Sequence, residues 1–303
     1  MDRTEERALE NRDRIWSLTL LSPALLFLVA FVIVPVAWIL YLSFHDIGIL
    51  EAQGTFIGFE NYVELLSDPE TYSALWTGTV YAVGSVGFQV LIGLFLALAL
   101  NKQFRGSGFA RTLAILPYIA PTIGVVLMWK WLLSPIYGLV NQLGVGAGLF
   151  SEPINFFGNP ELAMPTLIVA SSWKFISFCV LVLLARLQSI DESLYEQAKI
   201  SGASQFQMFR TITLPNLWNA ILLVVLLRVI WMFNKFGIVW LFTGGGPLSK
   251  TTTLPVLIYQ TTFQEFNLGK GSATAIILFT ILAVVAVIYF WYFKPSEEIE
   301  TTR

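Results

Sequence analysis

The sequence has few charged residues and almost no cysteine or histidine. Only 13% of its 303 residues are charged and 56% are hydrophobic, whereas soluble domains carry about twice that share of charge. One cysteine, Cys179, excludes a disulfide framework, and with one histidine, His45, it argues against a metal site built by the protein. No basic patch indicates nucleic-acid binding. This composition, with a mean hydropathy of +0.70, is typical of a membrane protein.

Six apolar runs are long enough to cross a bilayer as helices. The first exceeds a signal-peptide core in length and is followed by no small-residue cleavage site, so we interpret it as an uncleaved span. We therefore expect an all-α membrane protein in which residues 1–303 form a single transmembrane domain. The expected spans are residues 16–44, 77–100, 113–133, 164–187, 217–242 and 272–293.

Basic residues are distributed unevenly between the connections. With a cytoplasmic N-terminus, the segments on the inner side hold twelve Lys and Arg, and the outer segments hold three. Because Lys and Arg accumulate on the cytoplasmic side of membrane proteins, we expect both termini and the connection at residues 189–215 to be cytoplasmic.

That connection is the longest polar interval between two spans that still has the pattern of ordered helix. Ser189 with Glu192, and Ser204 with Gln207, have the spacing of capping boxes and predict two helix starts. Gly202 between them suits the left-handed residue that ends a helix. We expect a helix-turn-helix whose second helix is stopped by a proline before the fifth span begins.

Six residues of this connection match the pattern E-A-A, three residues, G, nine residues, I-x-L-P: Glu196, Ala198, Gly202, Ile212, Leu214 and Pro215. With them the connection resembles the signature of the membrane subunits of binding-protein-dependent ABC importers, which implies that residues 1–303 form one ABC transporter transmembrane domain. Gln197 and Ser201 depart from that signature. In that family the connection is the coupling helix, which sits in a groove of a cytoplasmic ATPase; the alternative is an ordinary amphipathic loop. The resemblance implies ATPase-coupling roles for Glu196, Ala198, Gly202, Ile212, Leu214 and Pro215.

Further segments look like those of carbohydrate permeases, such as the maltose and glycerol-3-phosphate permease subunits. Two of these segments are residues 58–69 and residues 233–247. The second of them ends in Thr-Gly-Gly-Gly-Pro. The resemblance implies import of a sugar-like solute by alternating access. It implies a second homologous permease, two ATPase subunits and an extracellular solute-binding protein as partners. ATP and Mg would be bound by the ATPases, so we expect neither an enzyme nor a cofactor in this chain.

Two cations fall near the middle of spans that contain no acid, Lys174 in the fourth and Arg228 in the fifth. A charge at that depth costs about 2.5–3.5 kcal/mol on insertion scales, so each needs a partner. We expect that partner to be a second subunit, the solute or a wet cavity. Alternatively, both faces pack against the partner permease. Helical spacing predicts a solute path lined by Ser171, Lys174, Phe178, Arg228, Trp231 and Met232.

Two other classes of membrane protein remain as alternatives. An ion-coupled secondary transporter typically has internal repeats and acids at the membrane midplane, and the sequence shows neither. A membrane scaffold subunit would not need the coupling signature. Residues 244–251 resemble a phosphate loop, but Ser249 replaces its second glycine, so we predict no ATP site in this chain.

Overall fold

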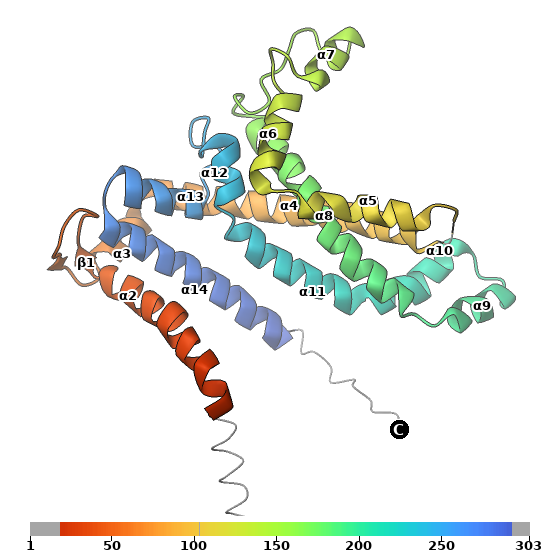
Figure 1. Ribbon diagram of the computed structural model, residues 1–303, viewed down its shortest axis with the longest axis horizontal. Helices are drawn as coiled ribbons and strands as arrows, with labels where there is room; N and C mark the ends of the chain where they lie inside the picture. Colours follow the sequence, from red (N-terminus) through yellow and green to blue (C-terminus); the bar gives the residue numbers. More distant parts are fainter. Residues whose placement is uncertain (1–18, 103, 293–303) are drawn as a thin grey trace, which may run out of the picture. The chain divides into compact units, whose positions relative to one another are not determined.

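The computed structural model describes residues 19–102 and 104–292, and this part of the chain is almost entirely helical (Figure 1). Three short π-helical turns interrupt the helices at Val29–Ile33, Phe209–Thr213 and Gln260–Gln264. The α-helices are α2 (Val34–Leu42), α3 (Glu60–Ser67), α4 (Pro69–Asn101), α5 (Ser107–Ile119), α6 (Thr122–Leu132), α7 (Leu139–Gly146), α8 (Ala163–Gln188), α9 (Glu192–Ile200), α10 (Gln205–Met208), α11 (Leu214–Phe233), α12 (Gly237–Thr243), α13 (Leu254–Tyr259) and α14 (Leu268–Tyr292).

Within the described residues, five helices are long and apolar enough to cross a membrane. A sixth span is obtained if α5 and α6 count as one, although the two are bent by 99° at their junction. The chain is therefore an all-α membrane protein with five or six candidate spans. The unbroken helices are Thr19–Leu42, Pro69–Asn101, Ala163–Gln188, Gln205–Phe233 and Leu268–Trp291.

The bend between α5 and α6 has a cause in the sequence. Pro117 lies inside α5, and Pro121 precedes the first residue of α6. Proline has no N–H to donate and its ring displaces the preceding turn, so the backbone of Ala120 and Pro121 leaves the helical region. The apolar run at 113–133 thus forms two half-helices, where the pattern alone predicts one straight helix.

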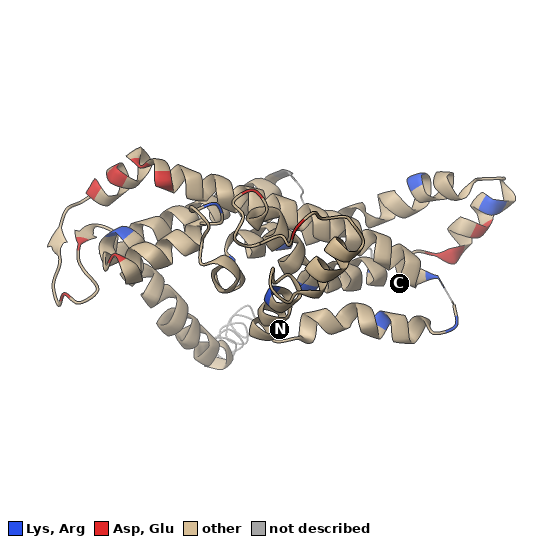
Figure 2. Ribbon diagram, turned by 90° about the horizontal axis from the view of Figure 1, so that it is seen from above, with Lys and Arg blue, Asp and Glu red and all other residues tan. Residues whose placement is uncertain are grey.

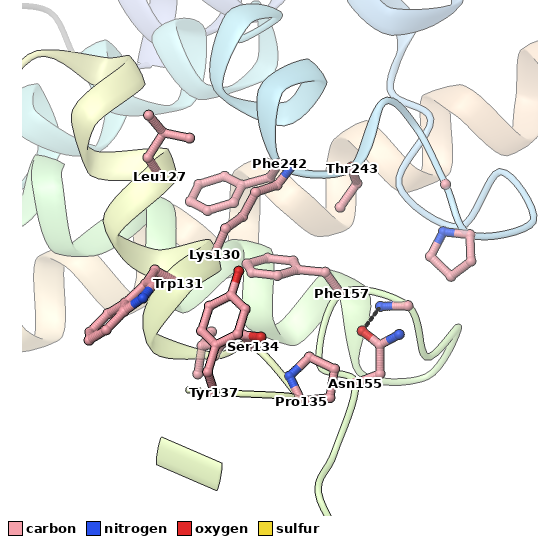
Figure 3. Close-up of a pocket in the computed structure, with 14 residues that line it drawn as sticks. Leu127, Lys130, Trp131, Ser134, Pro135, Tyr137, Asn155, Phe157, Phe242 and Thr243 are labelled. Carbon is pink, nitrogen blue, oxygen red and sulfur yellow. Dashed lines mark hydrogen bonds between the residues drawn. The ribbon is translucent and has the colours of Figure 1, made fainter. Parts of the chain in front are cut away.

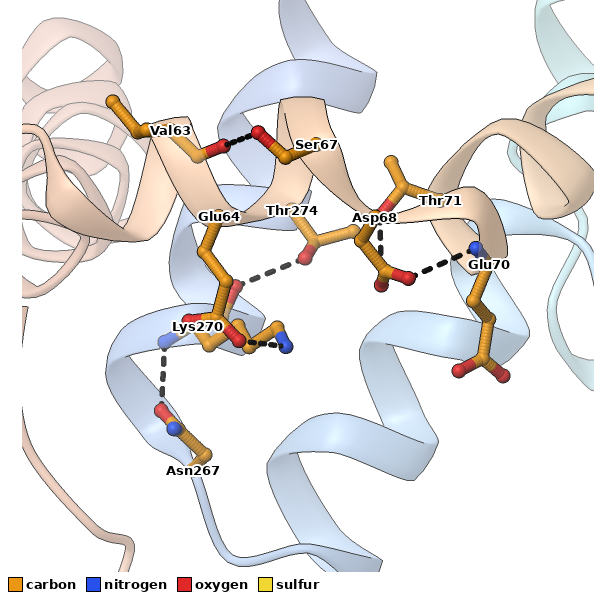
Figure 4. A network of polar contacts seen from close by, with 9 residues as sticks. All are labelled: Val63, Glu64, Ser67, Asp68, Glu70, Thr71, Asn267, Lys270 and Thr274. Atoms are coloured by element: carbon orange, nitrogen blue, oxygen red, sulfur yellow. Dashed lines mark hydrogen bonds and ion pairs between the residues drawn. The ribbon is translucent and has the colours of Figure 1, made fainter.

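The chain divides into two compact units, and the first comprises residues 1–67 and 258–277. Here α3 is fastened to the start of α14 by the ion pair of Lys270 Nζ with Glu64 Oε1, at 2.8 Å (Figure 4). The side chain of Asn61 donates to the backbone oxygens of Ser43 and His45 at 3.0 and 3.1 Å. A two-residue antiparallel ladder, β1 (His45–Asp46) with β2 (Thr55–Phe56), is the only sheet among the described residues.

The second unit, residues 68–257 and 278–303, contains the most extensive helix packing, between α4 and α8. A Cβ atom at Gly93 would lie 2.6 Å from Cβ of Cys179, so this close approach of the two helices requires glycine. Helix α11 packs on both, and α5 packs on α8. Their shared apolar core consists of Ala97, Leu100, Val180, Leu183, Leu184, Leu187, Leu217 and Ile221.

Charge is distributed unevenly within this second unit. The α4–α5 loop and the α9–α10 segment lie at the same end of it and carry basic residues (Figures 1 and 2). The Gly- and Pro-rich connection before α8 contains the short helix α7. The long helices α8 and α11 contain no Asp or Glu.

Candidate functional site

Helix α9 begins two residues later than the sequence pattern predicts. Its N-cap is Asp191, whose carboxylate accepts a hydrogen bond from the backbone N–H of Ser193 at 2.9 Å. That hydrogen bond holds the pKa of Asp191 below its ordinary value. Ser189 instead ends α8 and donates from Oγ to the backbone oxygen of Arg186. The predicted capping box at Ser189 is therefore wrong, because the nearer carboxylate takes the cap.

The turn after α9 agrees with the pattern. Gly202 has φ +79°, the left-handed conformation that glycine adopts without strain. The capping box of Ser204 with Gln207 is confirmed: Ser204 N donates to Gln207 Oε1 at 2.7 Å, and Gln207 N donates to Ser204 Oγ at 3.3 Å. The hydroxyls of Tyr195 and Thr213 lie 3.0 Å apart and join α9 to the following helix.

Pro215 does not stop the second helix. Helix α10 continues through the π-helical turn Phe209–Thr213 into α11, so that Gln205–Phe233 is one long helix. The π-helical turn stands directly before Leu214 and Pro215, and its wider backbone accommodates the proline within the continuous helix. Our prediction of a helix break at this proline is therefore wrong.

The segment from α9 to α10 presents an unusual mixture of side chains to its surroundings. Ile200 is 88% exposed and Phe206 is 71% exposed, beside the charged side chains of Glu196 and Lys199. Of the six signature positions, Glu196, Gly202 and Pro215 are exposed, and Ala198, Ile212 and Leu214 are half-buried. The two most exposed apolar side chains of this segment, Ile200 and Phe206, thus stand on either side of the turn at Gly202 in the sequence.

Inside the helical bundle, Arg228 finds a partner that the sequence argument missed. The side chain is 2% exposed, and its Nε donates to Oε1 of Gln89 on α4 at 2.7 Å (the arginine lies on α11). A terminal nitrogen of the guanidinium lies 3.0 Å from Sδ of Met232. The predicted partner, a second subunit, the solute or water, is thus replaced by a neutral amide of the same chain.

Aromatic rings complete the surroundings of this arginine. Its guanidinium carbon lies 4.6 Å from the ring centroid of Phe175, 6.0 Å from that of Phe178 and 5.7 Å from that of Trp231. The rings of Phe178 and Trp231 meet edge to face at 5.1 Å. Lys235, just past the end of α11, places Nζ 4.8 Å from the Phe175 centroid. Cation–π contacts of this kind favour a positive charge by about 0.5–2 kcal/mol each.

Lys174 bonds to the end of α5. The helical spacing in the sequence instead predicts that it lines the solute path with Arg228. Its ammonium donates to the backbone oxygens of Tyr118, at 3.1 Å, and Ala120. These carbonyls lie at the end of α5, where the bend leaves them without helical N–H partners. The lysine therefore caps the broken span, and it too is partnered within its own chain.

Hydroxyl and amide side chains connect α4 with α8 beside the arginine. Gln89 Nε2 donates to Ser172 Oγ at 3.2 Å, and that hydroxyl lies 3.5 Å from the backbone oxygen of Ser85. Ser171, predicted to line the solute path, is buried and donates to the backbone oxygen of Ile168. Of the six residues predicted to line the solute path, the helices bring four together: Phe178, Arg228, Trp231 and Met232. The other two, Ser171 and Lys174 on α8, are bonded to backbone oxygens elsewhere.

Gln89 carries a signal that sequence reasoning can use. It is the only amide side chain within the apolar run 77–100, and it is fully buried. A buried amide in a span requires a polar partner. A search for side chains able to accept from Arg228 would therefore have found it, once neutral acceptors were considered as well as acids.

A separate, open pocket of about 770 Å³ lies where α6, α12 and the connection before α8 meet (Figure 3). The rings of Phe157 and Phe242 stack there at 5.0 Å, and those of Trp131 and Tyr137 lie 6.5 Å apart. Three of its polar side chains, those of Ser134, Asn155 and Thr243, bond to the backbone; for example, Asn155 Oδ1 accepts from Gly158 N. The lining residues are Leu127, Lys130, Trp131, Leu133, Ser134, Pro135, Tyr137, Asn155, Phe157, Gly158, Phe242, Thr243, Gly246 and Pro247.

Known proteins share both the sequence and the fold. Residues 89–294 match the family model of the binding-protein-dependent transport system inner membrane component. The trehalose/maltose transport system permease protein MalF of Thermococcus litoralis is 32% identical over 95% of this chain and 97% of its own. The sulfoquinovosyl glycerol transport system permease protein SmoG of Agrobacterium fabrum is 34% identical over 93% and 92%.

A solved structure has the same fold. It is that of a bacterial ABC transporter involved in the import of the acidic polysaccharide alginate. One of its chains superposes with a TM-score of 0.82 at 24% identity, covering 96% of this chain and 100% of that one. This chain therefore has the fold of that chain.

Proposed function

Since the chain belongs to the family of binding-protein-dependent transport system inner membrane components, we propose that it forms, with a second homologous permease, the path by which an ATP-driven importer moves a sugar or sugar-like solute. The chain is a multi-pass, non-catalytic subunit of an inner membrane and has no cofactor of its own. ATP and Mg are bound by two ATPase partners, and an external solute-binding protein delivers the solute.

The segment from α9 to α10 is the proposed contact with the ATPase. Its support is the exposed pair Ile200 and Phe206 next to the turn at Gly202, a shape that fits a groove better than a flat surface. Glu196, Ala198 and Gly202 lie on this segment, Ile212 lies in the π-helical turn after α10, and Leu214 and Pro215 lie in the first turn of α11. Because α10 is continuous with α11, a push on this segment would be carried directly into a span.

The proposed solute path runs past the aromatic and cationic face at the end of α11. Trp231 is 40% exposed and Phe178 is half-buried, so ring faces are available beside the buried arginine. Flat rings pack against the apolar faces of sugars, and polar donors meet their hydroxyls. ATP-driven rocking of the spans would open this face to one side of the membrane and then to the other.

A carbohydrate is the proposed class of solute because two relatives at 32% and 34% identity are named for trehalose/maltose and for sulfoquinovosyl glycerol. The excess of basic residues at the loop end of the second unit supports cytoplasmic termini and a cytoplasmic α9–α10 segment. The open pocket at α6 and α12 then faces outward, where the solute-binding protein would dock.

Uptake into proteoliposomes tests this function. The chain, reconstituted with its partner permease, ATPases and binding protein, should accumulate a labelled sugar only when ATP is enclosed with the ATPases. Labelling of Lys199 with a membrane-impermeant reagent should succeed only from the ATPase side. Uptake driven by a proton or sodium gradient, in the absence of ATP, would contradict the proposal and favour a secondary transporter.

A further inference from the structure

The face at the end of α11 carries positive charge that the described chain does not neutralise. Within residues 19–102 and 104–292, neither Arg228 nor Lys235 forms an ion pair with an Asp or Glu. Among these described residues, the side-chain hydrogen-bond acceptors of Arg228 are the neutral groups of Gln89 and Met232.

Both cations, Arg228 and Lys235, contact the ring of Phe175. Phe175 has the guanidinium carbon of Arg228 at 4.6 Å from its centroid and the ammonium nitrogen of Lys235 at 4.8 Å. Because Lys174 is bonded to the carbonyls at the end of α5, its charge is balanced by the negative end of a helix. Arg228 and Lys235 have no such balance.

Like charges repel more strongly at membrane depth than in water, because the surrounding dielectric constant is low. A cation retained there marks the route of an ion or solute. We infer that the solute carried past this face bears an anionic group, a carboxylate, sulfonate or phosphate, and that Lys235 contacts it. The inference rests on the proposed transport function and assigns a charge to its solute.

The two cations have different parts in this site. Arg228 is 2% exposed and lies beneath Phe175, Phe178 and Trp231, so it attracts an anion through its field and does not touch it. Lys235 is half-buried and its ammonium can reach a group outside the cluster. Trp231 supplies the exposed ring beside it for the sugar itself. The solute thus has one charged end and one apolar sugar face.

Binding to the complete membrane complex in nanodiscs, with its ATPases but without the solute-binding protein, tests the inference. The probes are glucose, galactose and mannose, each as the neutral sugar and as its uronate, 6-phosphate and 6-sulfonate. The three anionic forms distinguish carboxylate, phosphate and sulfonate recognition. Calorimetric titration should show at least one anionic form bound about tenfold more tightly than its neutral parent, and less tightly as salt is raised.

The variants separate charge from packing. Lys235→Gln should lose about tenfold in affinity for the anionic form and leave the neutral sugar unchanged, whereas Lys235→Arg should keep the preference. Lys250→Gln, at an exposed lysine in the loop after α12, is the matched control and should change neither affinity. Equal binding of charged and neutral sugars, or an equal loss of both in Lys235→Gln, overturns the inference and leaves sugar transport standing. Absence of binding for every sugar contradicts the transport function as well.

Discussion

Arg228 Nε and Gln89 Oε1 lie 2.7 Å apart in the buried centre of the bundle, where they join α11 to α4. The bond pairs a full positive charge with a neutral amide. An Asp or Glu in the place of Gln89 would have cancelled the charge. The amide satisfies the hydrogen-bonding need of the guanidinium and leaves its electric field available. This distinction between bonding and neutralisation leads to the first two predictions.

Gln89→Leu should destabilise the protein. The substitution removes the acceptor of Arg228 and leaves a buried charge with a sulfur and aromatic rings as neighbours. Polar contacts between spans contribute about 1–2 kcal/mol in model systems, so we expect a loss of that size in the free energy of unfolding. Denaturant unfolding in mixed micelles measures it. Gln142→Leu, at an exposed glutamine of α7, is the control; equal effects of the two substitutions would contradict the prediction.

Gln89→Glu should keep the protein stable and weaken the binding of an anionic sugar. A carboxylate at this position still accepts from Arg228 and adds an opposite charge, so folding is retained. The field of Arg228 is then cancelled, and the affinity for an anionic sugar should fall severalfold while that for the neutral sugar stays constant. The binding titrations described above provide the measurement. An unchanged preference for the anionic form would show that the arginine field does not reach the solute.

Lys174→Met should impair the broken span and not the choice of solute. The ammonium is the side-chain partner of the carbonyls of Tyr118 and Ala120, and methionine cannot donate to them. We expect a loss of about 1–2 kcal/mol in the free energy of unfolding and slower uptake of charged and neutral sugars alike. Lys174→Arg should restore part of both. A selective loss of anionic sugars would instead place Lys174 on the solute.

Gly202→Ala should uncouple the chain from its ATPase. The glycine has φ +79°, and although no atom would obstruct a Cβ there, an L-residue pays about 1 kcal/mol for the left-handed conformation. Gly108→Ala is the matched control, since a Cβ there also meets open space and the backbone is helical. Gly202→Asn should retain function because asparagine tolerates this conformation.

Co-purification of the ATPase with the chain and ATP-driven uptake measure the coupling. Both should fall in Gly202→Ala and stay unchanged in the other two variants. Equal behaviour of Gly202→Ala and Gly108→Ala would mean that the turn conformation does not matter for coupling.

The cap of α9 should weaken in acid. Because the hydrogen bond from Ser193 lowers the pKa of Asp191 in the folded protein, its stabilisation is fully present above the unfolded value, about 3.9, and is lost as the pH falls through the lowered value. The hydrogen-exchange protection of the Ser193 amide should follow this profile. Asp191→Asn should keep the cap at every pH, and Asp191→Ala should lose it at every pH. A wild-type profile as flat as that of Asp191→Asn would contradict the assignment.

The sequence by itself determined the local features whose chemistry is contained in a few neighbouring residues. Glycine at 202 and the Ser204–Gln207 pair specify the turn and the second helix start, because left-handed φ and reciprocal capping are properties of those residues alone. Long apolar runs likewise specify membrane helices, since a bilayer leaves the backbone no other partner. The family signature on residues 196–215 is of the same local kind.

Only the tertiary structure decided what the buried cations bind. Gln89 and Arg228 are 139 positions apart, and the carbonyls bonded by Lys174 belong to a helix bend more than fifty residues away. No periodicity within one span shows which side chain of another span it meets. The structure also showed that Pro215 is accommodated within a continuous helix, directly after the π-helical turn Phe209–Thr213.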